Sequence, residues 1–308
     1  MGIMGKSKSR SIRMRSRVGL SSIRVLICAF LFGFALVGCA GPAPSPSGEQ
    51  GSVDGVSGSA APSAGVTVAQ IQERGYLLVG ASGDYCPMSM RNEDGSYWGF
   101  DADLAQDLAD DLGVELRYVE TTWPTILDDC VEGRFDIALC GISITDARLE
   151  RAIMSDPYLT NGKTALMRAE DVDVYTSLDA INREGVRVIE NPGGTNERLA
   201  REWLPNAEIT IHDVNEEIPA LIAEGEGDVM ITETSEAGYY VSRDPRLAAP
   251  LIDEPFSHGV TGALMNADSE DLLAYVNDFL AREEASGRLD ELRVTYIYGD
   301  AEELPEAA

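Results

Sequence analysis

The chain has 308 residues, and its 52 acidic residues outnumber its 24 lysines and arginines, which gives a formal net charge of −28. So negative a surface repels nucleic acids and anionic lipid headgroups, so neither is expected as a partner. A site for an anionic ligand must therefore be built from individual cations against the general field.

Residues 1–38 have the pattern of a secretory signal. Seven basic residues lie between Lys6 and Arg24, and an apolar run, VLICAFLF, follows them. The tetrapeptide LVGC at 36–39 is similar to the lipobox of bacterial lipoproteins, which implies cleavage before Cys39 and lipid on its thiol. A plain signal peptide with a chance cysteine is the alternative.

Residues 39–65 consist almost entirely of Gly, Pro, Ser and Ala. This composition cannot build a core and is typical of a flexible tether. Together with the signal, it predicts a protein outside the cytoplasm, held at the cell membrane by a lipid anchor on Cys39.

Strand-like and helix-like patterns alternate along the rest of the chain. Predicted strands lie at 77–80, 116–119, 135–139, 186–189, 209–211 and 229–231. Predicted helices lie at 101–112, 125–132, 196–203, 218–223 and 272–280. The first helix is the clearest, because Leu104, Leu108 and Leu112 recur every four residues. Alternating units of this length predict an α/β fold with largely parallel sheets.

Polar side chains follow most of the predicted strands, where ligands bind in open α/β sheets. They comprise small hydroxyls, an aromatic pair, one arginine and two carboxylates: Asp84, Tyr85, Thr121, Thr122, Trp123, Ser143, Thr145, Arg148, Thr232 and Glu233. We expect these residues to converge on a cleft.

The stretch NPGGTNERLA, at 191–200, leads from a predicted strand into a helix. Gly193, Gly194, Thr195 and Asn196 at a helix start make a good seat for an anion. Glu197 follows directly and would repel that anion if ionised. It is either a solvent-facing glutamate favoured by the helix dipole or an acid that is kept protonated.

Lys163 is the only lysine after the signal. Either a composition bias left it by chance, or an ammonium group is needed at that position. Both interpretations stay open at this point.

Histidine and cysteine do not indicate a metal site or a cofactor. His212 and His258 lie far apart, without acidic neighbours at ligand spacing, which argues against a metal site or a Ser-His-Asp triad. Cys86, Cys130 and Cys140 show no CxxC spacing. A disulfide between Cys130 and Cys140 stays an open alternative.

The order of the motifs resembles that of bacterial extracellular solute-binding proteins for polar amino acids. GFDADLA at 99–105 is similar to an early signature of that family, and residues 135–148 look like its carboxylate-binding segment. The resemblance implies a type II periplasmic-binding-protein fold, in which two α/β lobes are joined by two crossovers and close on a ligand. Lobe 1 is expected at 66–165 plus 257–308, and lobe 2 at 166–256.

Within that family, the chain more closely resembles the cyclohexadienyl dehydratase branch, which converts prephenate or arogenate into phenylpyruvate or phenylalanine. The shared motifs are GDY at 83–85, WP at 123–124, GISI at 141–144, GKT at 162–164 and NPGGTNE at 191–197. The last two are the specific ones. Glu233 departs from the pattern, since both branches usually carry aspartate there.

This chemistry needs cations that hold two carboxylates and a neutral acid beside the departing hydroxyl. Arg148 is the natural fork for one carboxylate, and Ser143, Thr195 and the amides of Gly194 and Thr195 at the helix start can hold the same group. Asn196 is a further candidate for binding the substrate. Lys163 would hold the other carboxylate or line the crossover.

Glu197 is the candidate acid. To act near neutral pH, its pKa must rise by roughly 2 units from about 4.3, which burial in a closed cleft can achieve. Trp123 and Tyr85 either flank the substrate ring or pack in the core. Asp84 caps a turn or contacts the ligand, and the role of Glu233 stays in doubt.

Two functions follow from these expectations. The first is a surface-anchored dehydratase that acts on prephenate or arogenate. The second is a lipid-anchored receptor that delivers a polar amino acid or a related small carboxylate to an ABC importer. The lipid anchor favours the receptor, whereas Lys163 and Glu197 favour the enzyme.

Overall fold

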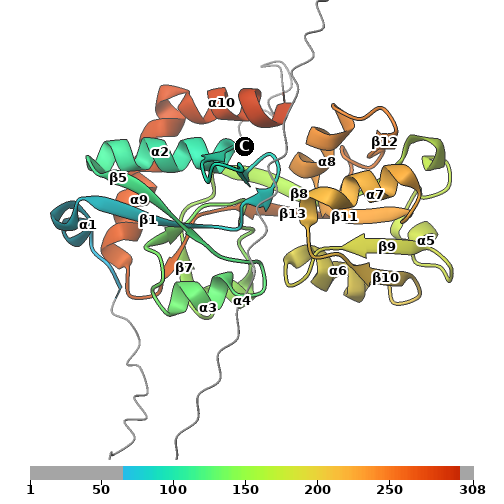
Figure 1. Ribbon diagram of the computed structural model, residues 1–308, viewed down its shortest axis with the longest axis horizontal. Helices are drawn as coiled ribbons and strands as arrows, with labels where there is room; N and C mark the ends of the chain where they lie inside the picture. The colour runs from blue at the N-terminus through green and yellow to red at the C-terminus, as the bar shows by residue number, and fades with distance from the viewer. Residues whose placement is uncertain (1–64, 299–308) are drawn as a thin grey trace, which may run out of the picture. The chain divides into compact units, whose positions relative to one another are not determined.

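The computed structural model describes residues 65–298, which form two lobes, each built around a mixed β-sheet (Figure 1). The predicted signal, Cys39 with its lipid, and the predicted tether up to residue 64 lie outside the described residues. No helix within 65–298 is long and apolar enough to cross a membrane.

The first sheet has the strand order β5-β1-β6-β14-β7. Its strands are β1 (Tyr76–Ala81), β5 (Glu115–Glu120), β6 (Ile137–Ala138), β7 (Ala152–Met154) and β14 (Leu264–Asn266). Strand β1 pairs in parallel with β5 and β6, whereas β14 pairs antiparallel with β6 and β7.

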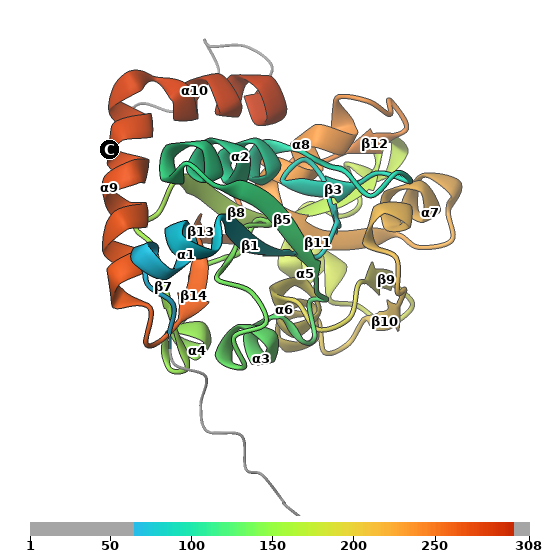
Figure 2. The ribbon, with the colours of Figure 1, turned by 60° about the vertical axis from the view of Figure 1, so that its left-hand side comes forward.

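Helices cover both faces of this sheet (Figure 2). The helices of this lobe are α1 (Val68–Arg74), α2 (Phe100–Leu112), α3 (Ile126–Val131), α4 (Asp146–Leu149), α9 (Glu270–Ser286) and α10 (Arg288–Arg293). Leu104 and Leu108 of α2 pack in the same buried cluster as Leu77 and Val79 of β1. Ile126 of α3 packs in a second cluster, on the other face.

The second sheet has the strand order β10-β9-β11-β8-β12, and β13 also pairs with β8. Its strands are β8 (Leu159–Arg168), β9 (Arg187–Glu190), β10 (Glu208–Ile211), β11 (Val229–Glu233), β12 (Leu247–Ala248) and β13 (Ser257–Thr261). The helices of this lobe are α5 (Leu178–Ile181), α6 (Thr195–Trp203), α7 (Ile218–Glu224) and α8 (Thr234–Val241). Ala200 of α6 packs on one face of the sheet, and Ile222 of α7 and Ala237 of α8 pack on the other.

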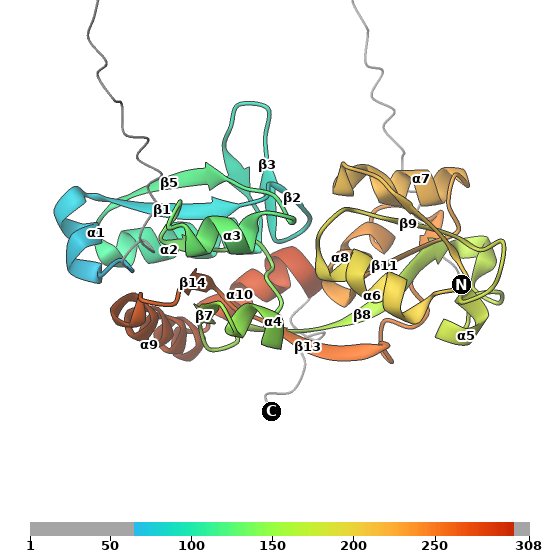
Figure 3. The same ribbon diagram turned by 90° about the horizontal axis from the view of Figure 1, so that it is seen from below.

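Strands β8 and β13 run side by side between the lobes (Figure 3). They pair antiparallel from Thr261 opposite Leu159 to Ser257 opposite Lys163. Lys163 therefore sits on a paired strand close to where the chain passes from one lobe to the other, rather than on a loop.

Two features differ from the sequence-based expectations. The sheets are mixed rather than largely parallel, because β8, β12, β13 and β14 are antiparallel to their neighbours. A small antiparallel sheet of β2 (Asp84–Tyr85), β3 (Ser89–Arg91) and β4 (Tyr97–Trp98) was not predicted, since strands of two or three residues show no period.

Three short helical turns complete the described chain: η1 (Ala169–Asp171), η2 (Asn215–Glu217) and η3 (Val294–Tyr298). Cys86, Cys130 and Cys140 are free and buried, so Cys130 and Cys140 are not joined by a disulfide in this structure.

Candidate functional site

A small cavity lies between the lobes, where the strand ends converge. Its lining residues come from both lobes: Tyr85, Trp123, Gly141, Ser143, Arg148, Asn191, Gly194, Thr195, Asn196, Asn215 and Glu233. The free volume is about 20 Å³. Since a buried water needs roughly 10–15 Å³ by such a measure, the lobes must separate before a larger ligand enters.

The start of α6 and Arg148, which were predicted to bind an anion, line the same cavity. Gly194 is the N-cap residue of the nine-residue helix α6, and no side chain caps its first amides. Arg148 is buried and donates from Nη1 to the carbonyl oxygen of Ser143 at 2.6 Å. Burial lowers the pKa of Arg148, but a guanidinium keeps its charge at any relevant pH. The structure thus brings the residues of the predicted carboxylate seat together, and their binding of a carboxylate stays a prediction.

Gly193 and Gly141 are needed for the close approach of the lobes and of the lining side chains. Gly193 has φ +81, and a Cβ there would lie 2.5 Å from the ring of Pro124 in the other lobe. Gly141 has φ +75, and a Cβ there would lie 2.5 Å from the ring of Tyr85. A side chain at either position would strain the backbone; at Gly193 it would also push the lobes apart, and at Gly141 it would displace the Tyr85 ring.

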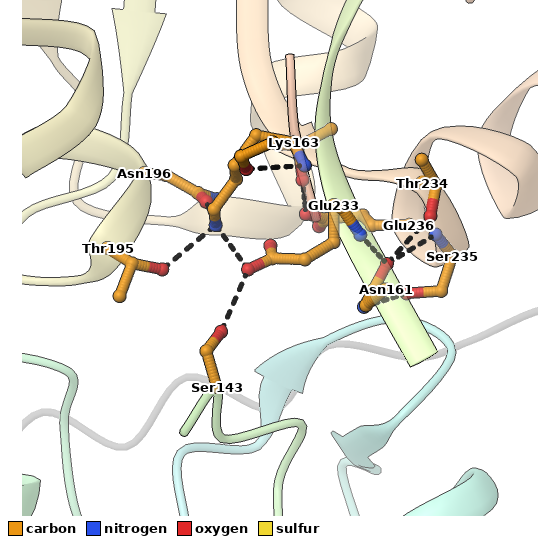
Figure 4. Close-up of polar contacts among 12 residues, drawn as sticks. Ser143, Asn161, Lys163, Thr195, Asn196, Glu233, Thr234, Ser235 and Glu236 are labelled. Atoms are coloured by element: carbon orange, nitrogen blue, oxygen red, sulfur yellow. Dashed lines mark hydrogen bonds and ion pairs between the residues drawn. The ribbon is translucent and has the colours of Figure 1, made fainter. Parts of the chain in front are cut away.

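Lys163 occupies the centre of the polar network in Figure 4. In the antiparallel register of β8 and β11 it lies opposite Glu233, and the two side chains form a buried ion pair. Its ammonium also donates to Thr195 Oγ1 at 2.8 Å and to Asn196 Oδ1. These three acceptors match the three N–H groups of a lysine ammonium, and only 6% of the side chain is exposed.

Glu233 joins the two lobes at this centre. Tyr85 donates its hydroxyl to Glu233 Oε2 at 2.7 Å, and Ser143 donates to Oε1 at 3.3 Å. Burial alone would raise the pKa of Glu233, but Lys163, Tyr85 and Ser143 together hold it below its ordinary value. Glu233 is therefore an ionised carboxylate, and the extra methylene relative to aspartate does not exclude it from the site.

The surroundings of Glu197 differ from those expected of a protonated acid. Its Oε2 accepts from the amide of Gly193 at 2.7 Å, and its Oε1 pairs with Arg201 at 2.9 Å. The Gly193 bond and Arg201 lower its pKa, and Glu197 does not line the cleft cavity. The pKa of Glu197 is thus lowered here rather than raised, because the carboxylate binds the Gly193 amide and Arg201, and the role of Glu197 as the acid stays a prediction.

Glu236 has the raised pKa that was expected of Glu197, although it does not line the cleft cavity either, and it was missed in the sequence. It lies in the first turn of α8, fully buried, where it accepts from Asn215 Nδ2 at 2.8 Å and from the Thr232 hydroxyl. Burial, reinforced by the charge of Glu233, raises its pKa to about 8. Glu236 is therefore a neutral acid at pH 7, and it lies directly behind Asn215, which lines the cavity.

A third buried carboxyl, Glu190, lies at the end of β9. Its Oε1 accepts from the amide of Ile231 at 2.7 Å, and its Oε2 has no partner. Burial raises the pKa of Glu190 well above its ordinary value. Of the three buried glutamates near Lys163, Glu233 alone carries the charge that the lysine neutralises.

The predicted aromatic pair lines the cavity, but Asp84 does not. The rings of Tyr85 and Trp123 meet edge to face, with their centroids 5.5 Å apart. Trp123 donates its indole N–H to Asp84 at 3.0 Å, and burial raises the pKa of Asp84. Asp84 thus orients Trp123 and, through its backbone oxygen, accepts from Asn215 of the other lobe at 3.2 Å.

A second cavity of about 150 Å³ lies on the crossover side of Lys163. It shares Ser143, Thr195 and Glu233 with the first cavity and adds Arg198 and His258. His212 lies elsewhere and pairs with Glu217 at 2.7 Å. Within residues 65–298, no group of histidine, cysteine and acidic side chains is arranged to hold a metal ion.

A sequence model of the bacterial extracellular solute-binding proteins, family 3, matches residues 77–299. The chain belongs to this family. The two lobes with a cleft between them are what this membership leads one to expect, and the interpretation of the sequence motifs as family motifs is confirmed.

Relatives include both an enzyme and binding proteins. The cyclohexadienyl dehydratase of Pseudomonas aeruginosa strain PAO1 is 41% identical over 220 residues, which cover 71% of this chain and 82% of that protein. The L-cystine-binding protein TcyJ of Escherichia coli strain K12 is 28% identical over 231 residues, covering 75% and 86%.

A solved structure also connects amino-acid binding with the dehydratase. The ancestral amino acid-binding protein AncCDT-1, a precursor of cyclohexadienyl dehydratase, has a TM-score of 0.69 and 33% identity, and the match covers 75% of this chain and 98% of that one. The fold therefore accommodates binding and turnover alike, and only the chemistry of the cleft can separate them.

Proposed function

We propose that this protein is a dehydratase of the cyclohexadienyl type, which converts prephenate or arogenate by expelling water and carbon dioxide. The observation that carries the proposal is a neutral buried acid, Glu236, bonded to Asn215, which lines the same cavity as Arg148 and the start of α6. A receptor needs the seat but has no use for the acid. The identity of 41% to a cyclohexadienyl dehydratase supports the same choice.

The proposed reaction breaks two bonds and makes the ring aromatic. The ring carboxylate leaves as carbon dioxide, and its electron pair enters the ring as the C–OH bond breaks. Hydroxide is a poor leaving group, so it departs as water after taking one proton. No separate base is required, because the electrons come from the carboxylate that is lost.

Glu236 supplies that proton in this proposal. A general acid acts best when its pKa lies near the working pH, and a pKa of about 8 meets this condition. Asn215 donates to Glu236, while its own Oδ1 has no partner and can accept from the substrate hydroxyl. Asn215 would thereby lie between the leaving group and the acid, so the proposed proton transfer requires Asn215 to turn aside and Glu236 to donate its proton directly to the hydroxyl. Glu197, ionised and paired at the rim, would serve the fold of the α6 start instead.

The remaining residues hold the substrate and the charges. Arg148, with the free amides of α6 and the hydroxyl of Thr195, would bind one carboxylate, while the hydroxyl of Ser143 stays bonded to Glu233. Lys163 has all three donors in use. Its proposed role is therefore to keep Glu233 ionised and the α6 start in place, rather than to bind the second carboxylate directly.

A prephenate turnover assay tests the proposal. Purified mature protein should produce phenylpyruvate, measured by its absorbance in base, well above the uncatalysed rate of the same solution. Production at the uncatalysed rate would remove the enzyme hypothesis.

The alternative is a receptor for a polar amino acid or a related carboxylate, working with an ABC importer. It is favoured by the closed two-lobed cleft and by binding proteins among the relatives. It predicts thermal stabilisation by the ligand without any chemical change. In either case, we propose that the LVGC motif directs lipid to Cys39 and that the protein works outside the cytoplasm at the membrane surface.

A further inference from the structure

Glu233 is the only acidic side chain among the described residues that line the cleft cavity. A ligand that carries an α-ammonium group needs an anionic partner in a buried site, because an uncompensated buried charge is costly. The state of Glu233 therefore decides whether the cleft accepts an amino acid.

Glu233 is already satisfied from within the protein. Its Oε1 accepts from Lys163 and Ser143, and its Oε2 accepts from Tyr85. The antiparallel register that sets Lys163 opposite Glu233 fixes the pair between neighbouring strands, so the pairing does not depend on a mobile side chain at the surface. Thr195 and Asn196 hold the same ammonium from the α6 side.

A ligand ammonium would meet a second positive charge at this position. It would approach the carboxylate that Lys163 already neutralises, with Arg148 as another cation of the same cavity. Like charges repel strongly where water is excluded. Asn191 and Asn215 offer unpartnered amide oxygens, but these are neutral and cannot offset an added charge.

A 2-oxo group at the same position carries no charge and meets no such repulsion. We propose that the Lys163–Glu233 pair makes the cleft select 2-oxo acids over the corresponding 2-amino acids. This inference rests on the proposed dehydratase function and narrows it: the substrate is prephenate, with its oxopropanoate side chain, rather than arogenate, with its amino-acid side chain.

Two matched pairs of compounds test the selection on the unmodified protein. The ratio of kcat/KM for prephenate to that for arogenate should be about tenfold or more. In binding measurements by calorimetry, phenylpyruvate should bind about tenfold more tightly than L-phenylalanine. Each pair differs only in the oxo and ammonium groups.

A variant then assigns the selection to its cause. Lys163→Met removes the ammonium but keeps the chain length, so the phenylpyruvate-to-phenylalanine affinity ratio should fall by about tenfold. Arg201→Met removes the exposed cation that pairs with Glu197 and should leave the ratio unchanged. If Lys163→Met does not fold, the ratios measured on the unmodified protein still decide the proposal.

The outcomes separate the two proposals. Turnover with equal efficiency for prephenate and arogenate, or tighter binding of phenylalanine, would overturn the selection and leave the dehydratase function standing. Preferential binding of phenylpyruvate without any turnover would support the selection and overturn the dehydratase function. If neither compound of either pair binds or reacts, both proposals fail.

Discussion

Glu197 and Glu236 occupy the same position in two helices of the same lobe. Each is the third residue of a helix that follows a strand of the second sheet, α6 after β9 and α8 after β11. Glu197 lies at the rim and accepts from an amide and an arginine, whereas Glu236 is buried and accepts from an amide side chain and a hydroxyl. The pKa of the first is lowered, and that of the second is raised to about 8.

The comparison shows that position in a helix does not decide the protonation of a glutamate. The helix dipole favours the ionised form at both positions. Burial without a cation outweighs the dipole at Glu236, while Arg201 adds to it at Glu197. The proposed acid is thus distinguished by its tertiary surroundings alone.

The largest expected effect separates the two glutamates in catalysis. Glu236→Gln keeps the size and the acceptor for Asn215 but cannot give up a proton, so kcat for prephenate should fall roughly 10²–10⁴-fold. Glu197→Gln is the matched control and should leave kcat within about threefold, because the Glu197 carboxylate is held ionised by the Gly193 amide and Arg201 and has no proton to give. The opposite order of the two effects would return the role of the acid to Glu197.

The Lys163–Glu233 and Arg201–Glu197 ion pairs should contribute differently to the stability of the fold. Lys163→Met leaves Glu233 buried without its cation and should lower the free energy of unfolding by about 3–5 kcal/mol. Arg201→Met removes a pair in which half of the arginine is exposed and should cost about 0–1 kcal/mol. Urea denaturation of both variants measures this difference, and equal costs would show that the Lys163 pair is as solvated as a surface pair.

The pH dependence of activity and stability should also separate them. Glu236 must be protonated to act, so kcat should be highest below about pH 8 and fall as the pH rises through that value. Because its pKa is raised in the folded state, its contribution to stability is complete below about pH 4.5 and is lost as the pH rises through about 8.

Glu236→Gln should therefore flatten the decline of stability across that window. Buried Asp101, whose pKa is raised to about 7 by burial, adds a decline of the same sign that the variant should retain. The pKa of Glu197 is lowered instead, so its contribution is present above about pH 4.5 and is lost in acid. A Glu236→Gln protein with an unchanged profile of urea midpoint against pH would contradict the assignment.

The smallest effect concerns the start of α6. Glu197→Gln weakens the bond to the Gly193 amide and the pairing with Arg201, and should lower the free energy of unfolding by about 0.5–1 kcal/mol at pH 7. Thermal unfolding at pH 7 and at pH 3.5 checks it, and the difference between wild type and variant should shrink at the lower pH. A constant difference would mean that the ionised carboxylate contributes nothing.

The sequence was sufficient for the elements with a clear period and for the anion seat. Leu104, Leu108 and Leu112 predicted α2 because one helix face must be buried, and the glycines before Thr195 predicted the start of α6. Lys163 stood out because no other lysine follows the signal. Its partner Glu233 did not stand out, since the register of two antiparallel strands is not visible in either strand alone.

Glu236 was missed for a related reason. Strand β11 runs into α8 without a glycine or proline between them, so the helix and its first turn were not predicted. The neutral state of this glutamate depends on Asn215 and Thr232 and on the exclusion of water, and these conditions are set by packing between separate segments. Local patterns contain no information about them.

The narrow cavity has a consequence for the timing of the proposed reaction. Each turnover uses one proton, and Glu236 lies behind a cleft that leaves room for little more than a water molecule. In this proposal Glu236 can regain a proton from solvent only while the lobes are apart. Each closure of the lobes then encloses one substrate molecule and one protonated Glu236. A reaction cycle of this kind depends on the frequency of opening, and kcat should fall as solvent viscosity increases.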